Sequence, residues 1–110
     1  DLDMLYGHRN NTVDYAKALV EFDRRIPEIL DAMKDGDILF ITADHGCDPT
    51  TESTDHSREY TPLVMYGKNV KKGANIHTRS SFSDIAATIK DYLGIDGHIE
   101  GKSFLKDIMD

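Results

Sequence analysis

The chain is 110 residues long, which suits one domain or part of one domain. Its formal net charge of -7 excludes broad attraction to nucleic acid or anionic lipid, although bound divalent cations can reverse the field locally for a phosphorylated substrate. No apolar run approaches the ~20 residues that span a bilayer, and no signal-peptide pattern is present. The single cysteine, Cys47, cannot form an internal disulfide. We therefore expect a soluble, cytoplasmic protein with no nucleic-acid or membrane partner.

The first periodic segment, about Thr12 to Lys34, predicts a helix, because its apolar residues recur every three or four positions. Asn11 or Thr12 is expected to cap its start, and Gly36 follows its end. Pro27 lacks an N–H donor, so we expect it to kink this helix or to split it in two.

Residues 37–43 predict a strand. Its run from Ile38 to Ile41 is continuously apolar, as in a strand covered on both faces. A polar stretch from Asp44 to Tyr60 follows, and residues 62–66 predict a second short strand that ends at Gly67.

A second helix is predicted over about Asp84 to Leu93, capped by Ser81 or Ser83 and closed by Gly94. The residues expected to face inward on it are Ile85, Ala86, Ile89, Tyr92 and Leu93. The residues expected to dock the mixed tail are Phe104, Leu105 and Ile108.

The order helix, strand, long loop, strand, helix predicts an α/β layered fold with a mainly parallel sheet. Two strands alone do not make a stable sheet. The chain also opens on Asp1 rather than on Met, in a segment that resembles the end of a strand entering a loop. We therefore expect a fragment whose preceding segments are missing.

Aspartate and histidine concentrate in three short segments: Asp3 with His8, Asp44 with His45, and Asp55 with His56. The second pair directly follows a predicted strand, and ligands in open α/β sheets bind beyond the carboxyl ends of strands. Carboxylate oxygen with imidazole nitrogen suits Mn²⁺, Zn²⁺ or Fe²⁺. Two such ions about 3.5–4 Å apart clamp the attacking and leaving oxygens of a phosphoryl group. A single Asp-His pair is more often a surface loop or a cap, but three segments together favour metal binding.

Other candidate residues have simpler explanations. His77 and His98 lie in polar stretches and are expected at the surface. Cys47 follows His-Gly in a turn, where a small packing residue is common, and the lysines of residues 68–72 suit a solvated loop. Asp55 is either a ligand itself or a residue that orients its neighbouring histidine.

Residues 41–50, Ile-Thr-Ala-Asp-His-Gly-Cys-Asp-Pro-Thr, resemble the alkaline phosphatase superfamily, in which a strand delivers Asp-His to the metals. The cofactor-independent phosphoglycerate mutases share its Ala-Asp-His-Gly core. The longer resemblance is to the phosphopentomutases and covers essentially the whole chain in unbroken order. It adds residues 3–9, 21–28 and 54–62, and its Asp-Pro-Thr and Thr-Asp-His-Ser-Arg-Glu blocks are specific to that family.

This resemblance implies an alkaline-phosphatase-like layered fold and two divalent ions, most simply Mn²⁺. The ligands that it implies are Asp44 and His45 for one ion, and Asp3, His8 and His56 for the other, which leaves Asp55 as a non-ligand. The implied isomerase reaction interconverts ribose 1-phosphate and ribose 5-phosphate, and the 2-deoxyribose equivalents, through a phosphothreonine.

The resemblance also implies that residues 1–110 are the C-terminal portion of a metal-binding catalytic core domain. The threonine nucleophile, one further aspartate ligand and the substrate-binding cap would lie in an absent N-terminal part. No catalytic residue is therefore assigned within this chain, and the chain alone is expected to be inactive. The alternatives are a phosphoglycerate mutase or phosphatase of the same superfamily, and a metal-binding module without catalysis.

Overall fold

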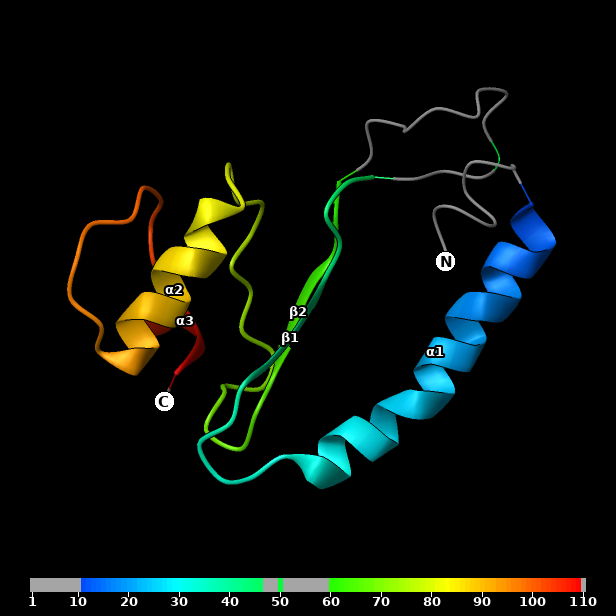
Figure 1. Ribbon diagram of the computed structural model, residues 1–110, viewed down its shortest axis with the longest axis horizontal. Helices are drawn as coiled ribbons and strands as arrows, with labels where there is room; N and C mark the ends of the chain where they lie inside the picture. Colours follow the sequence, from blue (N-terminus) through cyan, green and yellow to red (C-terminus); the bar gives the residue numbers. More distant parts are fainter. Residues whose placement is uncertain (1–10, 47–49, 51–59, 110) are drawn as a thin grey trace. The chain divides into compact units, whose positions relative to one another are not determined.

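The computed structural model describes residues 11–46, 50 and 60–109 (Figure 1). Its elements follow the order α1 (Thr12–Ala32), β1 (Leu39–Thr42), β2 (Leu63–Tyr66), α2 (Ser83–Leu93) and α3 (Leu105–Ile108). The chain divides into two compact units, residues 1–66 and 67–110. Among the described residues, none of the helices combines the length and the apolar character that crossing a bilayer requires.

The N-cap of helix α1 is Asn11, which confirms one of the two predicted caps. The Asn11 Oδ1 accepts the backbone N–H of Asp14 at 3.2 Å, and its amide Nδ2 donates to the Asp14 Oδ2 at 2.8 Å. The first of these bonds satisfies an N–H group that the first helical turn leaves without a partner. The helix continues through Pro27 to Ala32, so the predicted split does not occur.

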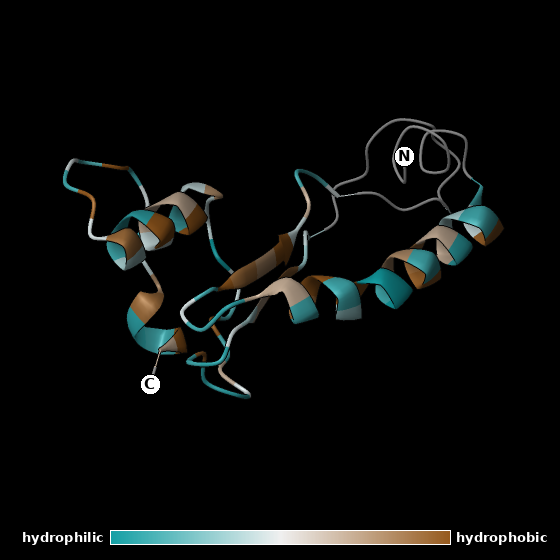
Figure 2. Cartoon of the chain, turned by 60° about the horizontal axis from the view of Figure 1, so that its bottom comes forward, coloured by the Kyte–Doolittle hydropathy of each residue, from teal (hydrophilic) through white to brown (hydrophobic). Residues whose placement is uncertain are grey.

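The apolar stripe of α1 is exposed. Apolar and polar residues alternate along this helix in Figure 2, and none of its residues is buried. Its exposed large apolar residues are Val13, Leu19, Val20, Phe22 and Ile29. Tertiary packing supplies most of a helix's stability in proteins, and the described elements do not provide it for α1.

A tight turn joins α1 to β1. The Asp37 Oδ2 accepts the N–H of Lys34 at 2.8 Å, and the Asp37 N–H donates to the Lys34 carbonyl at 3.0 Å. Gly36 between them has a φ of 91°, a conformation that glycine adopts without steric cost. The glycine that the sequence places after the helix therefore makes the turn.

Strands β1 and β2 confirm the two predicted strands, and they pair antiparallel. The register runs from Leu39 opposite Tyr66 to Thr42 opposite Leu63. The sequence predicts a mainly parallel sheet, and the described strands do not show one. The chain leaves β1 and enters β2 at the same end of the pair, whereas a parallel pair needs a crossover back to the opposite end.

In the second unit, the core lies between α2 and the C-terminal tail. Phe104 and Ile108 are fully buried, at 0% exposed, and Leu105 is half-buried. The predicted docking of the tail is thus confirmed. The backbone N–H of Lys71 donates to the Ile108 carbonyl at 2.7 Å, and Val70 forms an isolated bridge with Met109.

The start of α2 differs from the predicted cap, and its end agrees with the prediction. The cap residue is Phe82, without a side-chain capping bond, because Ser81 and Ser83 bond to each other on either side of it. The Ser81 Oγ still accepts the Ser83 N–H at 3.1 Å. Gly94 ends the helix in the left-handed conformation, at a φ of 65°.

The buried face of α2 is also not the predicted one. Its buried residues are Asp84, Ala87 and Thr88, whereas Ala86, Ile89 and Leu93 are exposed and Ile85 and Tyr92 are half-buried. The tail brings two backbone N–H groups to this face. The Asp84 Oδ1 accepts the N–H of Lys102 at 2.9 Å, and the Thr88 Oγ1 accepts that of Phe104 at 3.0 Å. Buried N–H groups require acceptors, and apolar side chains cannot supply them.

Arg79 completes this buried polar network. Its Nε donates to the Asp84 Oδ2 at 2.8 Å, and its Nη2 donates to the Lys102 carbonyl at 3.3 Å. The N–H of Lys102 and the guanidinium of Arg79 lower the pKa of Asp84 below its ordinary value, against the opposing effect of burial. The carboxylate therefore stays charged although it is only 4% exposed.

Candidate metal centre

The candidate centre starts immediately after β1. Thr42, the last residue of that strand, is paired with Leu63, and its Oγ1 donates to the Pro62 carbonyl at 2.7 Å. Asp44 and His45 follow two and three residues later. The hydrogen bond to Pro62 thus ties the end of β1 to the residue that precedes β2, just before the two candidate ligands.

The imidazole of His45 is oriented by its own backbone neighbourhood. Its Nδ1 lies 2.8 Å from the carbonyl oxygen of Gly46, and a carbonyl only accepts, so Nδ1 carries the hydrogen. In the neutral ring, Nε2 then carries the lone pair. A bond of this kind from the other ring nitrogen commonly fixes the tautomer of metal-binding histidines.

The donor atoms of the two candidate residues face each other. The His45 Nε2 lies 3.6 Å from the Asp44 Oδ1. The Asp44 side chain is 92% exposed, whereas that of His45 is only 27% exposed. The imidazole is therefore held within the protein, and the carboxylate stands at the surface beside it.

This donor set fits a divalent cation. Imidazole nitrogen and carboxylate oxygen bind such ions at about 2.0–2.2 Å, so one ion can reach both atoms across a gap of 3.6 Å. Mixed nitrogen and oxygen donors suit Mn²⁺ or Zn²⁺ better than Mg²⁺ or Ca²⁺. Two protein ligands leave further coordination positions for other groups.

The other predicted ligands, Asp3, His8 and His56, lie outside the described residues, as do Asp55 and Cys47. In the part of the chain that the structure describes, no three Asp, Glu, His or Cys side chains gather closely enough to hold an ion. The structure therefore brings Asp44 and His45 together and leaves the second ligand set untested.

The expected surface residues agree with the structure. His77 and His98 are exposed, and so are Lys68, Lys71 and Lys72 in the predicted solvated loop. Thr42 is the residue near the centre that the sequence reasoning missed. A hydroxyl at the end of a strand, next to Asp-His, was the available signal, but its partner at Pro62 is far along the chain and becomes evident only in the strand pair.

Comparison with known families decides the assignment. The metalloenzyme superfamily matches residues 1–97, a stretch that includes the end of β1 and both described donor residues. The chain belongs to the metalloenzyme superfamily. Membership of this superfamily implies the use of divalent metal ions, and the match does not identify the metal.

Among curated proteins, this metalloenzyme chain is similar to phosphopentomutases. It is 62% identical over 109 residues to the phosphopentomutase of Acetivibrio thermocellus and 65% identical to that of Clostridium acetobutylicum. Each alignment covers 99% of this chain and 28% of the relative. The phosphopentomutase of Kosmotoga olearia is 56% identical over 110 residues, which are 100% of this chain and again 28% of the relative. The chain thus spans just over a quarter of the length of these relatives.

Proposed function

We propose that this chain is part of a phosphopentomutase and supplies metal ligands to its two-metal site. The observation that carries this proposal is the 62% identity to a phosphopentomutase across 99% of the chain. The facing donor atoms of Asp44 and His45, 3.6 Å apart beyond the end of β1, support it independently. By this proposal, residues 1–110 are the C-terminal portion of the catalytic core, and β1 and β2 belong to a larger, mainly parallel sheet.

The proposed ligands are Asp44 and His45 for one Mn²⁺, and Asp3, His8 and His56 for the other. When bound, two divalent ions supply positive charge that stabilises a phosphoryl group during transfer. The protein orients the donor atoms of these side chains. The bond from Nδ1 to the Gly46 carbonyl leaves the His45 Nε2 without the hydrogen and beside the Asp44 Oδ1, and the Asp44 carboxylate offsets part of the cationic charge.

The proposed reaction interconverts ribose 1-phosphate and ribose 5-phosphate, or the 2-deoxyribose equivalents, in the cytoplasm. The nucleophile and the groups that hold the sugar are proposed to lie in the remainder of the longer polypeptide. Residues 1–110 therefore serve the reaction through the metals, and the pentose phosphate is the partner of the whole enzyme.

A comparison of two aspartate variants in the full-length polypeptide tests this proposal. Asp44→Asn keeps the shape of the side chain but removes the charged donor, whereas Asp23→Asn makes the same change on the exposed surface of α1. We expect Asp44→Asn to lose bound metal after dialysis and to lose conversion of ribose 1-phosphate. Asp23→Asn should keep both.

The outcomes separate the alternatives. If Asp44→Asn keeps the metal content and the activity of the wild type, Asp44 is not a metal ligand. A wild-type protein that converts phosphoglycerates, or that only releases phosphate, would instead favour another activity of the superfamily. A protein that binds metal but turns over none of these substrates would favour a non-catalytic metal-binding module.

A further inference from the structure

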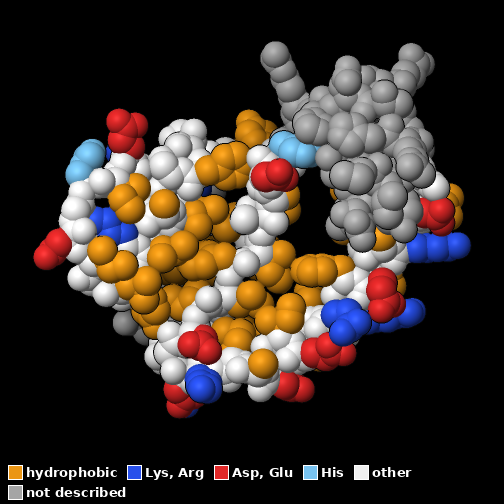
Figure 3. Space-filling view, in the orientation of Figure 1, with side chains coloured by type: hydrophobic (Ala, Val, Ile, Leu, Met, Phe, Trp, Pro, Cys, Tyr) orange, Lys and Arg blue, Asp and Glu red, His pale blue; other side chains and the backbone are white. Residues whose placement is uncertain are grey.

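Helix α2 has an apolar surface on the side away from the tail. We define the outer face as Ala86 and Ile89 of α2 with Ile95 and Ile99 of the following segment, flanked by Leu93. The exposed fractions are 42% for Ile89, 62% for Leu93, 55% for Ile95 and 39% for Ile99. Figure 3 shows apolar side chains gathered on the surface formed by this unit.

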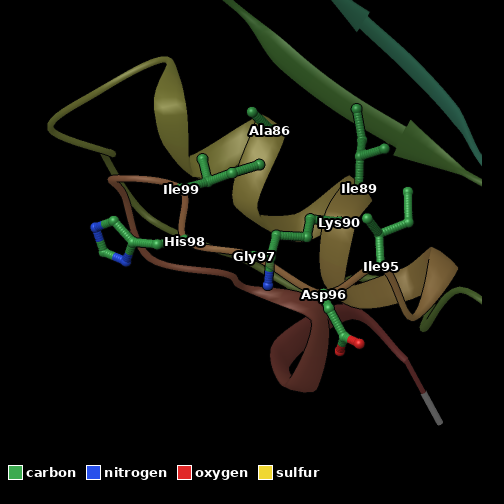
Figure 4. Close-up of a pocket in the computed structure, with 8 residues that line it drawn as sticks. All are labelled: Ala86, Ile89, Lys90, Ile95, Asp96, Gly97, His98 and Ile99. Atoms are coloured by element: carbon green, nitrogen blue, oxygen red, sulfur yellow. The ribbon is translucent and has the colours of Figure 1, made fainter.

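The outer face is hollowed. A depression of 340 Å³ is lined by its apolar residues together with Lys90, Asp96, Gly97 and His98 (Figure 4). In this view Ile99 lies near Ala86, and Ile89 and Ile95 point in similar directions, while the His98 ring and the Asp96 carboxylate point away from them. The His98 ring and the Asp96 carboxylate therefore stand at the rim, and most of the lining is apolar.

The two sides of α2 have the reverse of the usual polarity. The side that packs on the tail carries Asp84 and Thr88, and the outer side carries Ile89 and Leu93. A helix at the surface of a globular protein ordinarily turns its apolar stripe inward and its polar residues outward. A contiguous exposed apolar patch of this kind is characteristic of an interaction surface.

We propose that the outer face is an internal interface, covered by a segment of the same, longer polypeptide that lies outside residues 1–110. The inference rests on the proposed function, by which this chain is part of a phosphopentomutase. The relatives support this occupant, because the region they share with the chain is only 28% of their length. Most of such a polypeptide lies beyond the shared region and is available to pack here.

The chemistry of the face specifies its occupant. The apolar floor requires apolar side chains, since a polar group buried there would find no hydrogen-bond partner. Lys90 and Asp96, which also line the depression, can pair with charged or polar groups of either sign around that apolar contact. Helix α2 would then be packed on both sides, by the tail on its polar side and by the distant segment on its outer face.

Thiol labelling of the native full-length polypeptide tests this proposal. Leu93→Cys and Ile89→Cys place a thiol on the outer face, and Glu100→Cys and Lys72→Cys place one at exposed charged positions as controls. The time course of labelling is measured for each variant and for the parent protein. The difference between them excludes the labelling of Cys47 and of any other native thiol. If the face is covered, its thiols should react at least about tenfold more slowly than the controls.

Protein concentration distinguishes the occupants. Protection that is equal at two concentrations about a hundredfold apart supports an internal cover, whereas protection lost on dilution would overturn it in favour of a second copy. Labelling of Leu93→Cys as fast as Glu100→Cys would also overturn it. Circular dichroism checks that each variant is folded, and Ile89→Cys serves as the second variant if Leu93→Cys misfolds. The labelling measurement needs no catalytic activity. A polypeptide without mutase activity can therefore still show protection, so the two proposals fail separately.

Discussion

Arg79 and Asp84 form a direct ion pair at the start of α2, with the Nε of Arg79 2.8 Å from the Asp84 Oδ2. Only 5% of the Asp84 side chain and 25% of the Arg79 side chain are exposed. The Arg79 guanidinium also lies over the ring of Phe104, with 5.3 Å between Cζ and the ring centroid. One carboxylate thus joins the loop before α2 to the tail that follows it.

The charge of Asp84 should stabilise the fold in a pH-dependent way. Asp84→Asn keeps the shape but loses a charge-assisted bond, so we expect it to lower the free energy of unfolding by about 2 kcal/mol at neutral pH. The folded pKa of Asp84 is lowered, mainly by the Lys102 N–H, so its contribution is complete above the unfolded value of about 3.9. It is lost as the pH falls from there through the folded pKa.

Urea unfolding of both proteins across this acidic range measures the effect. The difference between wild type and Asp84→Asn should shrink as the pH falls below about 4. Asp107→Asn, at an exposed position on α3, is the matched control and should change little. A difference that stays constant with pH would show that the charge of Asp84 does not matter.

The hydroxyl of Thr88 should hold the tail through one hydrogen bond. Its Oγ1 donates to the Asp84 carbonyl at 2.7 Å and accepts the Phe104 N–H at 3.0 Å. Thr88→Val keeps the shape and removes both bonds, and we expect it to cost about 1–2 kcal/mol. Amide hydrogen exchange at Phe104 should accelerate in Thr88→Val but not in Thr88→Ser, which keeps the hydroxyl. Equal exchange in the two variants would contradict this role.

Gly101 should tolerate no side chain, because it passes against the start of α2. A Cβ built on it would lie 2.6 Å from both the carbonyl carbon and the oxygen of Ser83. Gly73 is the control, since it also has a positive φ, 74° against 109°, but no atom lies within 4 Å of its Cβ. Gly73→Ala should cost only the backbone strain, about 1–3 kcal/mol. Gly101→Ala should lower the melting temperature clearly more than the control substitution does. Equal decreases in melting temperature would show that the contact with Ser83 is easily relieved.

If Nε2 of His45 is the metal-binding atom, replacement of His45 by glutamine and by asparagine should have different effects on metal affinity. A glutamine side chain reaches the position of Nε2, whereas an asparagine side chain reaches only that of Nδ1, which already bonds the Gly46 carbonyl. We expect His45→Gln to retain part of the metal affinity of the full-length polypeptide and His45→Asn to lose more of it. Calorimetry with Mn²⁺ measures both, and stronger binding by His45→Asn would reverse the assignment of the two nitrogens.

Local sequence signals predicted most of the elements. The cap at Asn11, the turn at Gly36 and the helix end at Gly94 each depend on one residue and its immediate neighbours. Asp44 and His45 were placed correctly after the first strand for the same reason. The remaining predicted ligands lie outside the described residues, so their roles stay predictions.

Features that depend on distant partners were not predictable. Periodicity predicted that the isoleucines of α2 would face inward, but the described tail presents N–H groups that only Asp84 and Thr88 can accept. Nothing near these two residues in the sequence indicates that Lys102 and Phe104 will reach them. The antiparallel pairing of Thr42 with Leu63 likewise depends on where the chain returns.

The pairing of Thr42 with Leu63, reinforced by the Thr42–Pro62 bond, closes the intervening segment of chain into a loop. The entropy lost in closing a loop grows only with the logarithm of its length, about 0.6 kcal/mol for each doubling. Insertions between these two strands are therefore thermodynamically inexpensive. The two strands hold the ends of the segment beside Asp44 and His45 at nearly constant cost, so the entropy of closing the segment places little limit on its length.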